Sequence, residues 1–120
     1  MNRVIPFLFL ILSISFAQAK DVQIDGIYYA LYPDEFRATV VNDGNKSDDN
    51  GSGYEISELL IPETIVYEGI TYTVKSIGDY AFCNTKSLKS ITLSDSITKI
   101  GTRAFANCDS FQSIYISKNV

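Results

Sequence analysis

A segment in the C-terminal part of the chain is repeated with an offset of 23 residues. The first copy, IGDYAFCNTKSLKSITLSDSITK, begins at Ile77, and the second copy, IGTRAFANCDSFQSIYISKNV, begins at Ile100. A fixed period of this length is typical of a solenoid, in which each repeat forms one coil and buries its apolar side against the neighbouring coils. The identical pairs include Ile77/Ile100, Gly78/Gly101, Ala81/Ala104, Phe82/Phe105, Asn84/Asn107, Ser87/Ser110, Ser90/Ser113, Ile91/Ile114 and Ser94/Ser117. The repeat therefore predicts stacked coils that share one core.

The apolar positions within the repeat predict how one coil is built. Leu88, Ile91 and Leu93 follow an LxxLxL spacing, which predicts a short strand with these three side chains pointing inward. Ala81 and Phe82 are expected to enter the same core from the opposite wall. A coil of this kind is therefore expected to have one strand and one wall of turns.

Two features place the start of the array. Gly78 is expected to allow a sharp turn at which a Cβ atom would be costly. The segment LLIPETI, from Leu59 to Ile65, aligns with residues 91–97 and is interpreted as a degenerate earlier coil. A hairpin at Tyr67–Tyr72, with the turn Glu68-Gly69, interrupts this coil. The predicted array therefore covers residues 59–120, with full coils from residues 77 and 100.

Residues 20–58 predict a β-rich region ahead of the coils. Alternating apolar residues indicate strands at 22–24, 27–32 and 36–41, and the Asp25-Gly26 pair between the first two predicts a tight hairpin. Residues 42–53, NDGNKSDDNGSG, predict a flexible polar loop. The sequence as a whole therefore predicts a mainly β fold, in which a small antiparallel meander precedes the start of a solenoid with 23-residue coils.

The first 19 residues are typical of a secretory signal peptide. Arg3 is followed by an apolar run from Val4 to Ile14, and Ala17-Gln18-Ala19 matches a cleavage signal, so cleavage is predicted after Ala19. The alternative is an N-terminal membrane anchor, for which the run is short. No second hydrophobic span follows, so no membrane span is expected after removal of the signal.

The composition argues against several classes of function. The formal charge is -4 and becomes -5 without Arg3, which disfavours binding to nucleic acid. The chain has two cysteines and no histidine, so neither a zinc site nor a histidine-based catalytic site is expected. No cofactor and no enzymatic activity are predicted.

The repeat resembles the BspA-like (Treponema-type) leucine-rich repeats, whose pattern is IGxxAFxxCxxLxxIxLPxxIxxIG. The stretch ahead of it resembles the small β-rich region of such proteins from Bacteroidetes. The chain departs from the pattern in having Thr85 at a position usually held by Cys, and Ser94 and Ser117 where Pro is common, although Pro62 keeps the proline. The resemblance implies a secreted or cell-surface protein that adheres to host matrix or surface proteins, or to other microbes. The alternatives are a structural cap or spacer without binding activity and a truncated piece of a larger repeat protein.

The two cysteines admit two interpretations. Cys108 occupies the core Cys position of the resembled family, which favours a small buried side chain. Stacked coils also bring equivalent positions to strand spacing, so a disulfide to Cys83 is the alternative, although the two residues are out of register by two positions.

Residues between the inward positions of each predicted strand are expected to form an outward ladder that binds a protein partner. These candidate binding residues are Lys89, Thr92, Gln112 and Tyr115, together with Ser90 and Ser113. No polar capping coil follows the second copy, so the last coil is expected to expose its strand edge and core. Self-association through that edge, or marginal stability, is the expected consequence.

Overall fold

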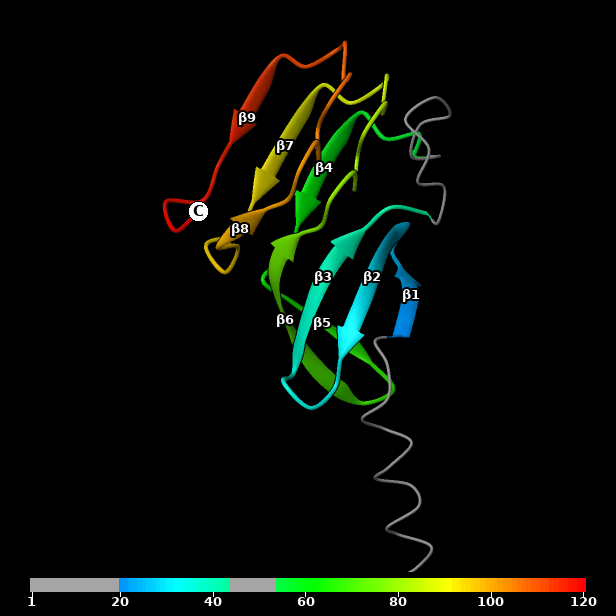
Figure 1. Ribbon diagram of the computed structural model, residues 1–120, viewed down its shortest axis with the longest axis vertical. Coiled ribbons are helices and arrows are strands. Elements are labelled where there is room, and N and C mark those ends of the chain that lie inside the picture. The colour runs from blue at the N-terminus through cyan, green and yellow to red at the C-terminus, as the bar shows by residue number, and fades with distance from the viewer. Residues whose placement is uncertain (1–19, 44–53) are drawn as a thin grey trace, which may run out of the picture.

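The described chain folds into nine strands in two sheets (Figure 1). The structure is a computed structural model and describes residues 20–43 and 54–120. The predicted signal peptide, and the predicted loop from residue 44 onward, lie outside the described residues. The strands are β1 (Lys20–Ile24), β2 (Ile27–Tyr32), β3 (Arg37–Val41), β4 (Glu58–Ile61), β5 (Thr64–Tyr67), β6 (Ile70–Ile77), β7 (Ser90–Leu93), β8 (Lys99–Ile100) and β9 (Ser113–Tyr115). The mainly β fold predicted from the sequence is confirmed.

Strands β1, β2 and β3 form the predicted antiparallel meander. Both residues of its first turn have positive φ, 51° at Asp25 and 83° at Gly26, as a tight hairpin requires. Glu68 and Gly69 have the same backbone form between β5 and β6, with φ of 50° and 79°. The third strand begins one residue later than expected, because Phe36 has a φ of 50° and belongs to the turn before β3.

The meander continues directly into the repeat region. Strand β6 pairs in parallel with β3 on one side and antiparallel with β5 on the other, and its end also pairs in parallel with β8. The larger sheet therefore has the order β1-β2-β3-β6-β5. It combines strands from the N-terminal region with strands that follow residue 59, where the repeat array was predicted to begin.

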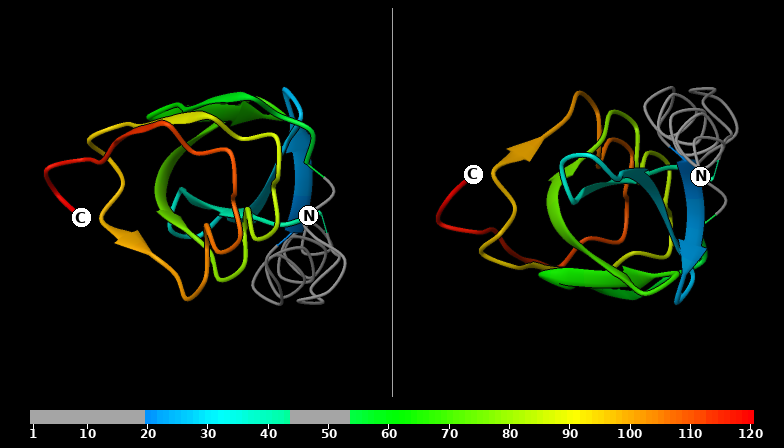
Figure 2. Two further views of the ribbon diagram at one scale, coloured as in Figure 1. Left: turned by 90° about the horizontal axis from the view of Figure 1, so that it is seen from above. Right: turned by 90° about the horizontal axis from the view of Figure 1, so that it is seen from below.

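The second sheet is the strand wall of the coils, in the order β4-β7-β9. Its three strands are parallel and lie side by side (Figure 1). Leu59 pairs with Ile91, and Ile91 pairs with Ile114. This register is the alignment expected from the sequence, including that of the degenerate coil. Viewed from above, this sheet lines one side of the coils and β8 lies on the other (Figure 2).

One core runs from the meander into the coils. The three predicted inward side chains of the first full coil are at most 1% exposed: Leu88, Ile91 and Leu93. Ala81 and Phe82 are fully buried, as predicted. Gly78 is needed for close packing against β3 and not for a positive φ, because a Cβ atom there would lie 2.9 Å from the carbonyl oxygen of Val40. The positive φ in this turn belongs to Tyr80 instead.

A column of aromatic rings follows the axis of the coils. Phe82 and Phe105, which are equivalent in the repeat, stack with their centroids 5.5 Å apart and their planes 8° apart. Tyr54 continues the column from Phe82 at 4.9 Å, and Tyr28 of β2 lies 6.0 Å beyond Tyr54. Phe111 ends the column, 5.9 Å from Phe105. The column therefore joins the meander to the last described coil.

Candidate functional site

The outer face of the β4-β7-β9 sheet presents two rows of side chains, because alternate residues of each strand point away from the core. One row is Glu58, Ser90 and Ser113, and the other is Leu60, Thr92 and Tyr115. Five of these six residues are exposed and Ser90 is half-buried. The three strands therefore offer one continuous outer surface, called here the strand face.

Of the four predicted binding residues, the structure places two on this face and the other two directly before its strands. Thr92 and Tyr115 are directly paired in the ladder, and both are exposed. Lys89 and Gln112 precede β7 and β9, and both are exposed. The backbone N–H of Gln112 donates a hydrogen bond to the backbone carbonyl of Lys89 at 2.7 Å, and the backbone N–H of Lys89 donates one to the carbonyl of Ser57 at 2.7 Å. Their part in binding stays a prediction.

Two members of the strand face were missed by the sequence reasoning. Glu58 and Leu60 belong to β4 and extend both rows by one strand. The alignment of LLIPETI with the strand of the next coil contained the signal, because it places Leu60 opposite Thr92. Leu60 is 69% exposed, which makes it the most exposed large apolar residue described.

The chemistry of the strand face suits recognition of a protein. Leu60 and Tyr115, which is 56% exposed, offer apolar contact area, while Ser90, Ser113 and Thr92 offer hydroxyl groups. Tyrosine in particular is common at the energetically important centres of protein interfaces. Within residues 20–43 and 54–120, His, Cys, Asp and Glu side chains nowhere gather in threes that could hold a metal ion.

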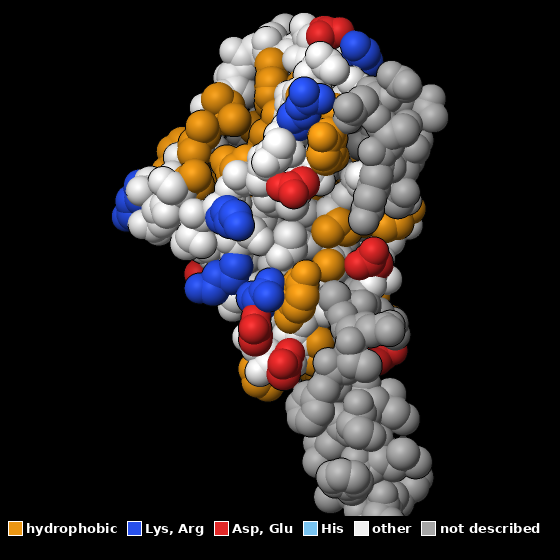
Figure 3. All heavy atoms as spheres, in the orientation of Figure 1, with side chains coloured by type: hydrophobic (Ala, Val, Ile, Leu, Met, Phe, Trp, Pro, Cys, Tyr) orange, Lys and Arg blue, Asp and Glu red, His pale blue; other side chains and the backbone are white. Residues whose placement is uncertain are grey.

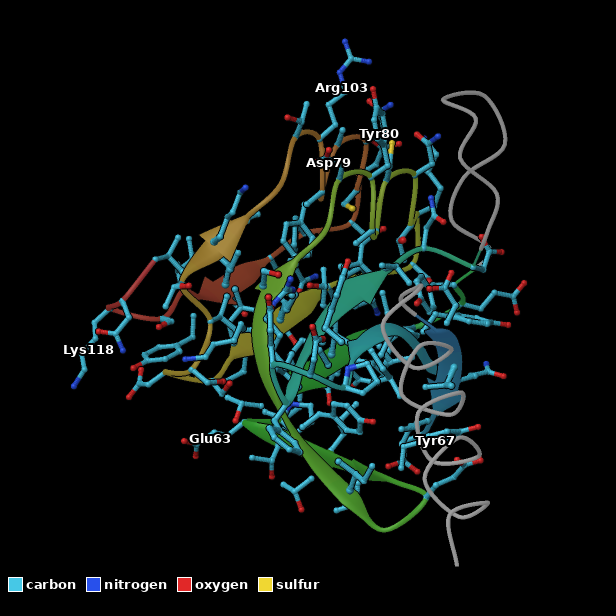
Figure 4. The ribbon with its side chains drawn as sticks, turned by 60° about the horizontal axis from the view of Figure 1, so that its bottom comes forward. Glu63, Tyr67, Asp79, Tyr80, Arg103 and Lys118 are labelled. Atoms are coloured by element: carbon cyan, nitrogen blue, oxygen red, sulfur yellow. The ribbon has the colours of Figure 1, made fainter. Side chains whose placement is uncertain are left out.

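The corner of the coils is held by contacts between equivalent residues. Asp79 accepts a hydrogen bond from the Thr102 amide, 2.7 Å from its Oδ1 atom, and Thr102 is its equivalent in the next coil. Tyr80 and Arg103, also equivalent, have φ of 58° and 53°. Figure 4 shows Asp79, Tyr80 and Arg103 gathered at this corner, away from Glu63 and Tyr67. The repeated backbone form explains why the coils stack in register.

The two cysteines are both free thiols in the structure, so no disulfide joins them. Cys83 is buried, and Cys108 is half-buried with its Sγ atom 3.2 Å from the Phe82 carbonyl oxygen, to which it donates a hydrogen bond. Burial raises the pKa of the Cys108 thiol. Of the two interpretations of the sequence, the structure therefore agrees with packed, unpaired thiols.

The pattern of short parallel strands and stacked phenylalanines agrees with the family comparison. A family model for the BspA type leucine rich repeat region, which contains six copies of the repeat, matches residues 57–120, more than half of the chain. The chain belongs to the BspA-type leucine-rich-repeat family. The match begins one residue before β4, so the degenerate coil lies within the family region.

Three solved structures of leucine-rich proteins share this fold. A leucine-rich cell surface protein from Faecalibacterium prausnitzii is 27% identical, with a TM-score of 0.65 over 84% of this chain and 24% of that one. A leucine-rich repeat protein from Bacteroides ovatus is 25% identical, with a TM-score of 0.66 over 84% of this chain and 24% of that one. One from Bacteroides capillosus is 28% identical, with a TM-score of 0.66 over 83% of this chain and 67% of that one.

The chain thus spans about a quarter of the length of the first two of these proteins. No curated protein matches it in sequence. In the part of the chain that the structure describes, no helix is long and apolar enough to cross a membrane.

Proposed function

We propose that this chain is a secreted or surface-exposed binding protein that adheres to a protein ligand through its strand face, without catalysing a reaction. The observation that carries the proposal is the alignment of exposed residues across three strands, with Leu60 and Tyr115 in one row. Parallel, hydrogen-bonded strands place these residues at fixed spacing, so little backbone conformational entropy is lost when a partner binds.

Export supports the location of this activity. Residues 1–19 have the features of a signal peptide, and one similar solved protein is named as a cell surface protein. The ligand class proposed is a host extracellular-matrix or cell-surface protein, or a surface protein of another microbe.

The proposal is tested by binding to a panel of immobilised extracellular-matrix glycoproteins. Tyr115→Ala and Lys89→Ala are expected to weaken binding to whichever glycoprotein the natural chain retains, without lowering the melting temperature, because both side chains are exposed. Lys99→Ala removes the same charge from β8, outside the strand face, and is expected to bind as the natural chain does. Unchanged binding of both Tyr115→Ala and Lys89→Ala would contradict the proposal that the strand face binds the ligand.

A structural cap is the second candidate, favoured by a specific contact. Tyr54 continues the aromatic column, and its hydroxyl group donates a hydrogen bond to the Val41 carbonyl at 2.8 Å and accepts one from the Tyr28 amide at 2.9 Å. The meander thereby covers the first coil, as a solenoid end requires. If the chain acts only as a cap, deletion of residues 20–43 is expected to unfold the coils while no strand-face variant changes any binding.

A further inference from the structure

Two adjoining hollows lie beside β4, next to the strand face. Their volumes are about 510 Å³ and about 470 Å³, and they meet at Asp25, Ile27 and Leu60, which line both. The wall opposite β4 comes from the β1–β2 turn. The two hollows together are called here the β4-edge groove.

Strand β4 is the edge of its sheet on the side of this groove. It pairs with β7, and no other strand among the described residues pairs with it. The Ser57 carbonyl accepts a hydrogen bond from the Lys89 amide on the β7 side. Alternate residues of a parallel strand direct their backbone groups to opposite sides, so the N–H and C=O groups of Glu58 and Leu60 point away from β7. Such an edge is a template for pairing with an extended segment.

The larger hollow is acidic. Four carboxylates line it, and none of its described lining residues is a lysine or arginine. Three of the four, Asp25, Glu55 and Glu58, form no ion pair within the described part of the chain. One of these carboxylates also affects a buried tyrosine. Burial raises the pKa of Tyr29 to about 12, and the negative charge of Asp25 contributes to this rise. The hollow therefore favours a cation.

The smaller hollow is apolar. Its lining includes Ile24, Tyr29 and Ile65, which are buried or half-buried, and two exposed apolar side chains. Leu60 is 69% exposed and Val66 is 61% exposed. Since both side chains lie beside one hollow, a partner that covered them would remove a large apolar area from water.

We infer that the β4-edge groove binds an extended segment of a partner protein that carries a lysine or arginine close to an apolar residue. The basic side chain enters the acidic hollow, and the apolar side chain covers Leu60 and Val66. The backbone of the segment lies along the free edge of β4. The carboxylates select against acidic segments and against phosphate-rich partners, because like charges in contact repel. The groove shares Glu58 and Leu60 with the strand face but is not lined by Lys89, Thr92, Gln112 or Tyr115, so variants at those four residues distinguish the two proposals.

The test is an NMR titration of the ¹⁵N-labelled chain with the peptide acetyl-Gly-Lys-Ser-Val-Gly-amide. Amide shifts are expected to change at Asp25, Glu58 and Leu60, and the affinity is expected to fall when salt is raised to about 0.5 M, because exposed charges are then screened. Peptides with Glu in place of Lys, or with Ser in place of Val, are expected to bind at least about fivefold more weakly.

Two variants distinguish this groove from the part of the strand face that carries Lys89 and Tyr115. The double variant Glu55→Gln and Glu58→Gln keeps the shape of the hollow and is expected to weaken binding of the lysine peptide about fivefold or more. The variant Lys89→Ala with Tyr115→Ala alters only the strand face and is expected to bind the peptide unchanged. Equal binding of the lysine and glutamate peptides would overturn the inference, as would shift changes confined to Thr92 and Tyr115.

Discussion

The ring of Tyr54 lies 4.9 Å from the ring of Phe82, centroid to centroid, and this contact joins the meander to the first full coil. Tyr54 is 8% exposed and takes the place in the column that phenylalanine takes in the two following coils. Its hydroxyl group bonds the backbones of β2 and the end of β3. Burial raises the pKa of the Tyr54 phenol well above its usual range, so the hydroxyl group stays protonated and can donate.

Loss of the Tyr54 hydroxyl group is expected to destabilise the whole chain. Tyr54→Phe leaves the Tyr28 amide and the Val41 carbonyl without this partner, and the expected cost is about 1–3 kcal/mol in the free energy of unfolding. Tyr54→Ala also empties the column and is expected to cost about 3–5 kcal/mol. Urea-induced unfolding measures both.

Tyr115→Phe is the matched control for this change, because the Tyr115 hydroxyl group belongs to an exposed residue. Its effect is expected to stay within about 0.5 kcal/mol. Equal stability of Tyr54→Phe and Tyr115→Phe would contradict the bridging role of the Tyr54 hydroxyl group.

Gly101 is expected to tolerate no side chain. A Cβ atom there would lie 2.6 Å from the Asp79 amide nitrogen and 2.8 Å from the Gly78 carbonyl carbon, and it would also collide with Asp79 Oδ1. Because two of these neighbours are backbone atoms, Gly101→Ala is expected to destabilise the chain by about 1–3 kcal/mol. Thermal unfolding compared with Thr102→Ala, at the exposed next position, measures the effect. A melting temperature as high as that of Thr102→Ala would show that the coils can move apart.

Alkaline pH is expected to weaken the fold through Tyr29. Burial raises the pKa of this phenol from 10.0 to about 12, so the folded state binds the proton more tightly than the unfolded chain does. The corresponding stability is fully present below pH 10 and is lost as the pH rises through about 12. Melting temperatures measured between neutral pH and this range are expected to fall less steeply in Tyr29→Phe. An identical fall in both proteins would contradict the prediction.

The period of 23 residues was sufficient to predict the coils, because inward positions that recur at fixed spacing admit one register. The two hairpins followed from the need for positive φ at Asp25-Gly26 and Glu68-Gly69. The parallel pairing of β3 with β6 could not be predicted, since it joins strands that are far apart in the sequence and carries no local signal. The β4-edge groove was also out of reach, because it exists only where the β1–β2 turn comes near Leu60.

The last coil is expected to drive self-association of a protein that comprises residues 20–120. Ile114 and Ile116 are 46% and 47% exposed, whereas their equivalents Ile91 and Leu93 are at most 1% exposed beneath the next coil. Apolar side chains gather at this end of the molecule (Figure 3). Ile114→Lys is expected to lower the apparent mass in size-exclusion chromatography with light scattering, because the charge opposes burial of the surface. Thr98→Lys adds the same charge at another exposed position and is expected to associate as the natural chain does. A protein of residues 20–120 that stays monomeric at every concentration would contradict this expectation.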